Sequence, residues 1–154
     1  MINTEWILGL NKSDLQQVHA IRHTVFCQEQ QIDQTLEQDG LDESAVHLLV
    51  SYKGTPAATG RLLVTTDEFL LGRIAVLPDF RGKQLGDLVV RLLIRMAYTM
   101  GGERQVVHSQ LPVQSFYEKL GFAPIGEVYQ ESGVPHITME RFGDIFGTCE
   151  DSRA

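Results

Sequence analysis

The chain has few cysteines and no long apolar run, and each lack excludes a class of protein. Its 154 residues include two cysteines, Cys27 and Cys149, which lie far apart and form no CxxC pair. This spacing favours free thiols in a reducing compartment over a disulfide framework. No apolar stretch approaches the roughly 20 residues that a membrane-spanning helix needs, and the first residues do not resemble a secretory signal. We therefore expect a cytoplasmic protein with no membrane partner.

Positive charge is scarce as well. Lys and Arg number 13 against 20 Asp and Glu, so the formal net charge is −7, which argues against general binding to nucleic acid. The histidines are not spaced like metal ligands, and we expect no metal. The basic residues are nevertheless concentrated in one stretch that contains Arg73, Arg81, Lys83, Arg91, Arg95 and Arg104. An acidic protein with one basic stretch suits a small anionic cofactor and a cationic co-substrate.

The apolar periodicity gives the order of elements along the chain. Apolar runs predict strands near residues 5–8, 46–52, 57–65, 69–76, 105–109, 123–129 and 136–141. Helical spacing predicts helices from residue 15 to about 28–31, over 85–100 and over 112–120. This order predicts one mixed α/β domain over residues 1–142. We expect a polar loop with at most a short helical turn over 33–43, and a mobile tail over 143–154.

The most informative segment of the chain is 72–86. It reads as a short apolar strand, a Pro78-Asp79 break, a polar loop with Gly82 and Gly86, and the start of a helix. A strand that delivers a glycine loop to a helix N-terminus is a common way to hold phosphate, because free backbone N–H groups and the helix dipole point at the anion. Arg81 and Lys83 add positive charge at the same place.

Two common phosphate-binding loops do not match this segment. A P-loop requires GxxxxGK[ST], and neither Ser nor Thr follows Lys83. A dinucleotide-binding fold requires GxGxxG, whereas Gly82 and Gly86 are spaced differently and come after several predicted strands. Another kind of phosphate compound is therefore indicated.

The loop Arg81-Gly82-Lys83-Gln84-Leu85-Gly86 resembles the acetyl-CoA loop of the GNAT N-acetyltransferase superfamily, whose pattern is Gln/Arg-x-x-Gly-x-Gly/Ala. Arg81 takes the first position and Gly86 the last, while Gln84 replaces the middle glycine. The block Phe116-Tyr117-Glu118-Lys119-Leu120-Gly121-Phe122 resembles the short helix and turn near the C-terminus of these enzymes. The segments 25–30 and 133–136 resemble the small bacterial ElaA-type branch of the superfamily.

The resemblance implies a central, mostly antiparallel sheet whose middle strands splay apart, with helices at its sides. It implies that the backbone of Ile74, Ala75 and Val76 binds the pantetheine of acetyl-CoA by strand addition. The N–H of Val76 would polarise the thioester carbonyl. The six residues of the loop, with Phe116, would complete the cofactor site. The Cβ of Gln84 would crowd the pyrophosphate, unless the backbone there has a φ that is not positive.

Candidate catalytic and substrate-binding residues follow from the same comparison and from charge placement. Tyr117 is either a core residue or, as in many GNAT enzymes, the acid that protonates the departing thiolate. Arg22 and Glu29 lie on the apolar face of a predicted helix, and Arg61 lies in an apolar strand, so each is either a rim residue or lines a substrate cleft. Glu29 would then bind a cationic amine or act as its base, and His136 is the histidine that we would test first as the base.

We therefore interpret the chain as an N-acetyltransferase that moves an acetyl group from acetyl-CoA to a primary amine by direct attack. The alternatives are an acyl-CoA-binding module without turnover and a nucleotide-binding regulator. The acceptor is a small-molecule or peptide amine whose identity the sequence does not give. One of the last predicted strands is exposed, and it either pairs with a second copy in a homodimer or remains a plain sheet edge.

Overall fold

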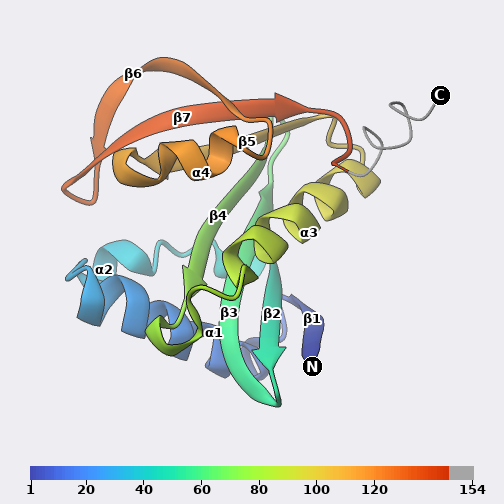
Figure 1. Ribbon diagram of the computed structural model, residues 1–154, viewed down its shortest axis with the longest axis vertical. Helices are drawn as coiled ribbons and strands as arrows, with labels where there is room; N and C mark the ends of the chain where they lie inside the picture. The colour runs from blue at the N-terminus through green and yellow to red at the C-terminus, as the bar shows by residue number, and fades with distance from the viewer. Residues whose placement is uncertain (146–154) are drawn as a thin grey trace.

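A seven-stranded sheet runs through residues 1–145, the part of the chain that the structure, a computed structural model, describes (Figure 1). Its strands are β1 Ile2–Leu8, β2 Val46–Tyr52, β3 Thr55–Val64, β4 Phe69–Val76, β5 Arg104–Gln110, β6 Ala123–Glu131 and β7 Val134–Phe142. The α-helices are α1 Gln16–Arg22, α2 Gln34–Glu37, α3 Leu85–Thr99 and α4 Gln114–Glu118. None of the helices described is long and apolar enough to cross a membrane.

The strands lie in the order β1-β2-β3-β4-β5-β7-β6. Every neighbouring pair is antiparallel except β4 and β5, which are parallel. The hairpins predicted between residues 46 and 65 and between 123 and 141 are both present as β2–β3 and β6–β7. The mixed, mostly antiparallel sheet predicted from the sequence is therefore confirmed.

The contact between β4 and β5 is short. Only Phe69, Leu70 and Leu71 pair with β5, at Gln105–Val107, after which β5 continues beside β7 alone. At the same point β4 is irregular: its register against β3 shifts, and Arg73 has a φ of 51°. Figure 1 shows β5, β6 and β7 turning away from the direction of β4. The second half of β4 therefore presents an edge that no strand within residues 1–145 covers.

Two apolar clusters hold the helices to opposite faces of the sheet. Leu48 and Val50 of β2 belong to the cluster around α3, while Leu49 between them belongs to the cluster around α1. Alternate residues of a strand face opposite sides, so α1 and α3 cover different faces. α3 lies so close to β3 that a Cβ on Gly60 would lie 2.6 Å from Val89.

The helix predicted to reach residues 28–31 reaches Glu29, but only its first part is α-helical. α1 ends at Arg22 and a π-helical segment, His23–Glu29, follows it. The domain end at Phe142 stays a prediction; beyond it, Gly143 N–H donates to the Glu103 carbonyl at 2.8 Å and Ile145 packs against the core. The rest of the predicted tail, 146–154, lies outside the described residues, and its mobility stays a prediction.

Candidate functional site

A cavity of about 590 Å³ lies where the loop after β4 enters α3. Most of the predicted cofactor residues line it, namely Val76, Arg81, Gly82, Gln84, Leu85, Gly86 and Phe116. Gln84 is the N-cap of α3, and its carbonyl accepts the first helical hydrogen bond, from Leu88. The three N–H groups between them have no partner within the helix, as at any helix start. The cavity therefore meets free donors and the positive end of a 15-residue helix.

The backbone at Gln84 is in the left-handed region, with a φ of 61°. The alternative of a φ that is not positive is therefore wrong, and a side chain stands where the backbone prefers glycine. Gly82 also has a positive φ, of 83°, which glycine adopts without strain. Gln84 is one of the residues that line the cavity at the mouth of the helix.

Cations surround this cavity, and two of them were not predicted. These two are Arg91 and the exposed Lys119, which both line the cavity. Arg91 lies one helical turn after Asp87 and donates a hydrogen bond to its carboxylate at 2.7 Å. Arg91 belongs to the basic stretch noted in the sequence, and Lys119 to the second sequence block, so each had a signal. Lys83 instead places its Nζ over the ring of Tyr52, 5.0 Å from its centre, and does not line the cavity.

The free edge of β4 presents backbone groups of particular residues. On the side of β4 that faces β3, Leu77 N–H donates to the Ala57 carbonyl at 2.9 Å. Ala75, two residues before Leu77, pairs with Thr59 of β3. Because hydrogen-bonded pairs alternate in an antiparallel ladder and peptides are planar, the Ile74 carbonyl and the Val76 N–H point to the other edge. The backbone of Ala75 faces β3, which does not favour the predicted contact of Ala75 with pantetheine.

A second cavity, of about 490 Å³, lies on the β5 side of this edge and is lined by both Ile74 and Tyr117. The ring of Tyr117 is buried against Phe116 and Phe122, with ring centres 5.1 and 5.7 Å away. Burial raises the pKa of Tyr117 well above its ordinary value. Among residues 1–145 nothing hydrogen-bonds its hydroxyl, so a protonated phenol faces the cavity.

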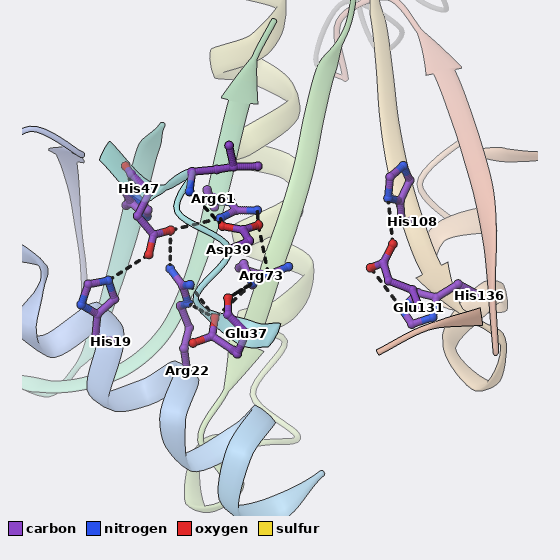
Figure 2. A network of polar contacts seen from close by, with 12 residues as sticks. His19, Arg22, Glu37, Asp39, His47, Arg61, Arg73, His108, Glu131 and His136 are labelled. Atoms are coloured by element: carbon purple, nitrogen blue, oxygen red, sulfur yellow. Dashed lines mark hydrogen bonds and ion pairs between the residues drawn. The ribbon is translucent and has the colours of Figure 1, made fainter. Parts of the chain in front are cut away.

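Glu131 lies between two histidines on the wall of this second cavity (Figure 2). Its carboxylate is 3.3 Å from His108 Nδ1 and 3.7 Å from His136 Nε2. The hydrogen bond with His108 lowers the pKa of Glu131, more than burial raises it. His136 Nδ1 lies 2.7 Å from the Val134 carbonyl and must carry a hydrogen there, so Nε2 bears the lone pair when the ring is neutral. The predicted base candidate His136 thus lines the same cavity as Tyr117.

Opposite this group, six side chains form what we call the arginine–carboxylate network: Arg22, Arg61, Arg73, Glu37, Asp39 and Asp42 (Figure 2). Arg22 Nε donates to Glu37 at 2.7 Å, and Arg61 makes two hydrogen bonds to Asp39, at 3.0 and 2.9 Å. Burial would raise the pKa of Asp42, but Arg22 and Arg61 outweigh it and hold the pKa well below its usual range.

The network bears on two predicted substrate residues. Arg22 has no exposed surface and does not line the cavity, and Arg61 lines it with a guanidinium already bound by two carboxylates. Both arginines therefore fix the segment from Glu37 to Asp42 as a cavity wall. This placement favours a positioning role over direct contact with a substrate.

Glu29, predicted as a base or amine-binding group, lies at the end of the π-helical segment and lines neither cavity. Its two carboxylate oxygens accept hydrogen bonds from the Arg81 guanidinium at 2.6 and 2.7 Å. These hydrogen bonds lower the pKa of Glu29, which weakens it as a base. Over residues 1–145, no group of three or more His, Cys, Asp or Glu side chains could hold a metal ion.

Comparisons with known proteins show the family and the fold of the chain. The family model for the acetyltransferase (GNAT) domain matches residues 11–141. The uncharacterized protein YyaT of Bacillus subtilis (strain 168) is 32% identical over 133 residues, which cover 84% of this chain and 90% of YyaT. Protein ElaA of Escherichia coli (strain K12) is 31% identical over 137 residues, which cover 86% of this chain and 90% of ElaA.

Two solved structures have the same fold. The crystal structure of Escherichia coli ElaA matches with a TM-score of 0.81 and 28% identity, over 92% of this chain and 99% of that chain. An acyl-CoA N-acyltransferase from Pseudomonas aeruginosa matches with a TM-score of 0.82 and 26% identity, over the same shares of the two chains. The fold predicted from the two sequence blocks is thereby confirmed. The chain belongs to the GNAT acetyltransferase family, with ElaA among its relatives.

Proposed function

We propose that the protein is an N-acetyltransferase that uses acetyl-CoA to acetylate a primary amine. The observation that carries the proposal is the uncovered edge of β4, with a cation-lined cavity at one end and the Tyr117 cavity at its side. An extended molecule with an anionic end and a reactive end fits that arrangement. The Pseudomonas aeruginosa relative, named an acyl-CoA N-acyltransferase, supports the same class of cofactor.

The residues at the β4 edge and in the first cavity fit acetyl-CoA without requiring a metal. The free N–H groups at the start of α3, with Arg81, Arg91 and Lys119, would hold the pyrophosphate. The Ile74 carbonyl and the Val76 N–H would pair with pantetheine amides as a neighbouring strand would. Acetyl-CoA, when bound, supplies a thioester for the amine to attack and a thiolate as the leaving group.

Three groups of the chain then handle protons and charge. His136 Nε2 accepts a proton from the arriving ammonium, and Glu131 stabilises the imidazolium that results. The Val76 N–H stabilises negative charge on the carbonyl oxygen. The Tyr117 hydroxyl gives its proton to sulfur as the C–S bond breaks, and regains one from the newly bonded nitrogen. One N–C bond forms, one C–S bond breaks, and one proton leaves to solvent.

Binding and turnover test the proposal separately. Acetyl-CoA should raise the melting temperature by mass action, and thiol should appear when amines are added. No thermal shift at millimolar acetyl-CoA would refute it.

A second candidate is an acyl-CoA-binding module without turnover, and the side chain of Gln84 at the helix mouth favours it. Such a module would show the thermal shift and release no thiol with any amine.

A further inference from the structure

We propose that the acceptor is a primary amine with an apolar body, such as an alkylamine or arylalkylamine, and that Glu131 binds its ammonium group. This inference rests on the proposed N-acetyltransferase function and specifies its acceptor. It follows from two properties of the second cavity, the apolar residues at its rim and the pairing of its charges.

The apolar residues come from three separate segments. Leu36, Leu41 and Val113 are 53%, 42% and 44% exposed, and all three line this cavity. Phe26 and Ile32 add apolar surface deeper in the same wall. A single exposed apolar side chain is ordinary, but several that converge on one cavity indicate a surface for an apolar ligand.

The charges of the cavity leave one carboxylate for a ligand. Among the described lining residues the acids are Glu37, Asp39 and Glu131. Glu37 and Asp39 are bound by arginines of the arginine–carboxylate network. Within salt-bridge distance Glu131 has only histidines as partners in residues 1–145, and the charge of Arg73 acts on it from farther away. An ammonium group bound there would lie beside His136 Nε2, in the cavity that Tyr117 also lines.

The same pairing disfavours other acceptors. An amino acid would bring a carboxylate, but the lining arginines Arg61 and Arg73 are already held by carboxylates. A diamine would bring a second ammonium, for which no second carboxylate is free among the described lining residues. An amino sugar would place some of its hydroxyl groups against the apolar side chains Leu36, Leu41 and Val113, which is costly. Two amides of the wall, Gln30 and Gln110, bind each other at 3.0 Å.

Matched pairs of amines test the inference. Hexylamine and 1,6-diaminohexane differ by one amino group, and 2-phenylethylamine and phenylalanine differ by one carboxylate. With acetyl-CoA saturating, we expect kcat/KM to be at least about tenfold higher for the first member of each pair. Because 1,6-diaminohexane has two equivalent amino groups, chance alone would make its kcat/KM twofold higher than that of hexylamine.

Variants locate the two recognition elements. Glu131→Gln should lower kcat/KM for hexylamine at least about tenfold and leave KM for acetyl-CoA unchanged, whereas Glu127→Gln, at an exposed position of the same strand, should change neither. Leu36→Ser should raise KM for hexylamine several-fold, and Leu10→Ser, at a more exposed position outside the cavity, should not.

The outcomes separate this inference from the proposed function. Preference for the diamine, glucosamine or the amino acid would overturn the inference while acetyl transfer stood. If acetyl-CoA binds but no amine is acetylated, the deciding measurement is whether hexylamine raises the melting temperature of the protein in complex with coenzyme A. A rise that Glu131→Gln abolishes would support the inference even though transfer failed. If hexylamine caused no rise, the inference would be overturned.

Discussion

Glu29 and Arg81, 52 residues apart, are joined by two parallel hydrogen bonds between carboxylate and guanidinium. The pair ties the end of the π-helical segment to the first residue of the proposed cofactor loop. Arg81 Nε also donates to the Val76 carbonyl at 3.1 Å, so each of the three guanidinium nitrogens donates one hydrogen bond. A pyrophosphate at this loop would have to compete with Glu29 for Arg81.

Glu29→Gln should therefore strengthen the binding of acetyl-CoA. Removing a competing carboxylate from an exposed ion pair should lower KM for acetyl-CoA about twofold to fivefold and leave kcat nearly unchanged. Steady-state kinetics with varied acetyl-CoA measures this. If turnover instead fell about 100-fold, Glu29 would be the general base after all.

Tyr117→Phe should lower kcat at least about 100-fold, because the phenol is the acid proposed for the departing thiolate. KM for acetyl-CoA should change little, since the ring and its packing against Phe116 and Phe122 remain. Tyr98→Phe, an exposed tyrosine of α3, is the control and should behave like the parent protein. An unchanged kcat for Tyr117→Phe would assign Tyr117 to the core.

His136→Gln should lower kcat/KM for the amine about 100-fold at neutral pH, because the variant has no group to take the ammonium proton. The loss should shrink as pH rises, since more of the amine is then already neutral. A pH profile of kcat/KM measures both effects. His23→Gln, at an exposed position of the π-helical segment, should match the parent protein. A loss that stayed constant with pH would indicate a structural role for His136.

Gln84→Gly should increase affinity for coenzyme A several-fold, because it removes a side chain from the mouth of α3 and suits the positive φ. Gln31→Gly is a close control, since Gln31 has a φ of 58° and lines neither cavity. Both variants should change unfolding free energy by less than about 1 kcal/mol, because relief of strain opposes the greater freedom of the unfolded chain. Calorimetry measures the affinity for coenzyme A. If Gln84→Gly and Gln31→Gly changed this affinity equally, the assignment of Gln84 to the coenzyme A site would be contradicted.

His47 should make stability depend on pH. Burial lowers the pKa of His47, although its hydrogen bond to the Asp42 carbonyl acts in the opposite direction. The unfolded chain, with an ordinary histidine pKa near 6.5, then binds a proton at a higher pH than the folded chain. This contribution to stability is therefore present above about pH 6.5 and is lost as the pH falls below it.

Urea unfolding at pH 7.5 and 5.5 measures that loss. The Asp42 pKa is held well below its usual range, so its carboxylate does not titrate in this window. His47→Gln should flatten the dependence, since its amide can still donate to the Asp42 carbonyl, and His23→Gln should leave it as in the parent protein. An equally steep dependence in His47→Gln would exclude His47 as the source.

Local patterns predicted the elements that bind the proposed cofactor. The strand 69–76, the glycine loop and the apolar stripe of α3 are each encoded by neighbouring residues, so β4 and α3 appear close to their predicted bounds. The bulge at Arg73 has no such signature, because it results from the mismatch of β4 with β3. The identity of the backbone groups on the free edge follows from that pairing and was beyond the sequence.

Long-range pairing also determines the second cavity. His108, Glu131 and His136 come from three strands, and only the register of β5, β7 and β6 brings them together. Arg22 was recognised as an inward-facing charge, but Glu37 and Asp42, which bind it, lie in the segment 33–43 that was predicted as a polar loop. A pattern of residue types identifies a charge that needs a partner and does not identify the partner.

The three residue pairs that join β4 to β5 have a consequence for selectivity by shape. An uncovered strand edge at the surface of a protein can recruit any extended chain. Here the edge lies inside a fork between two parts of one sheet. A guest that pairs with this edge does so as one extended strand, and the two cavities lie along its path. The fork therefore favours an extended guest over a folded chain, independently of the side chains that line the cavities.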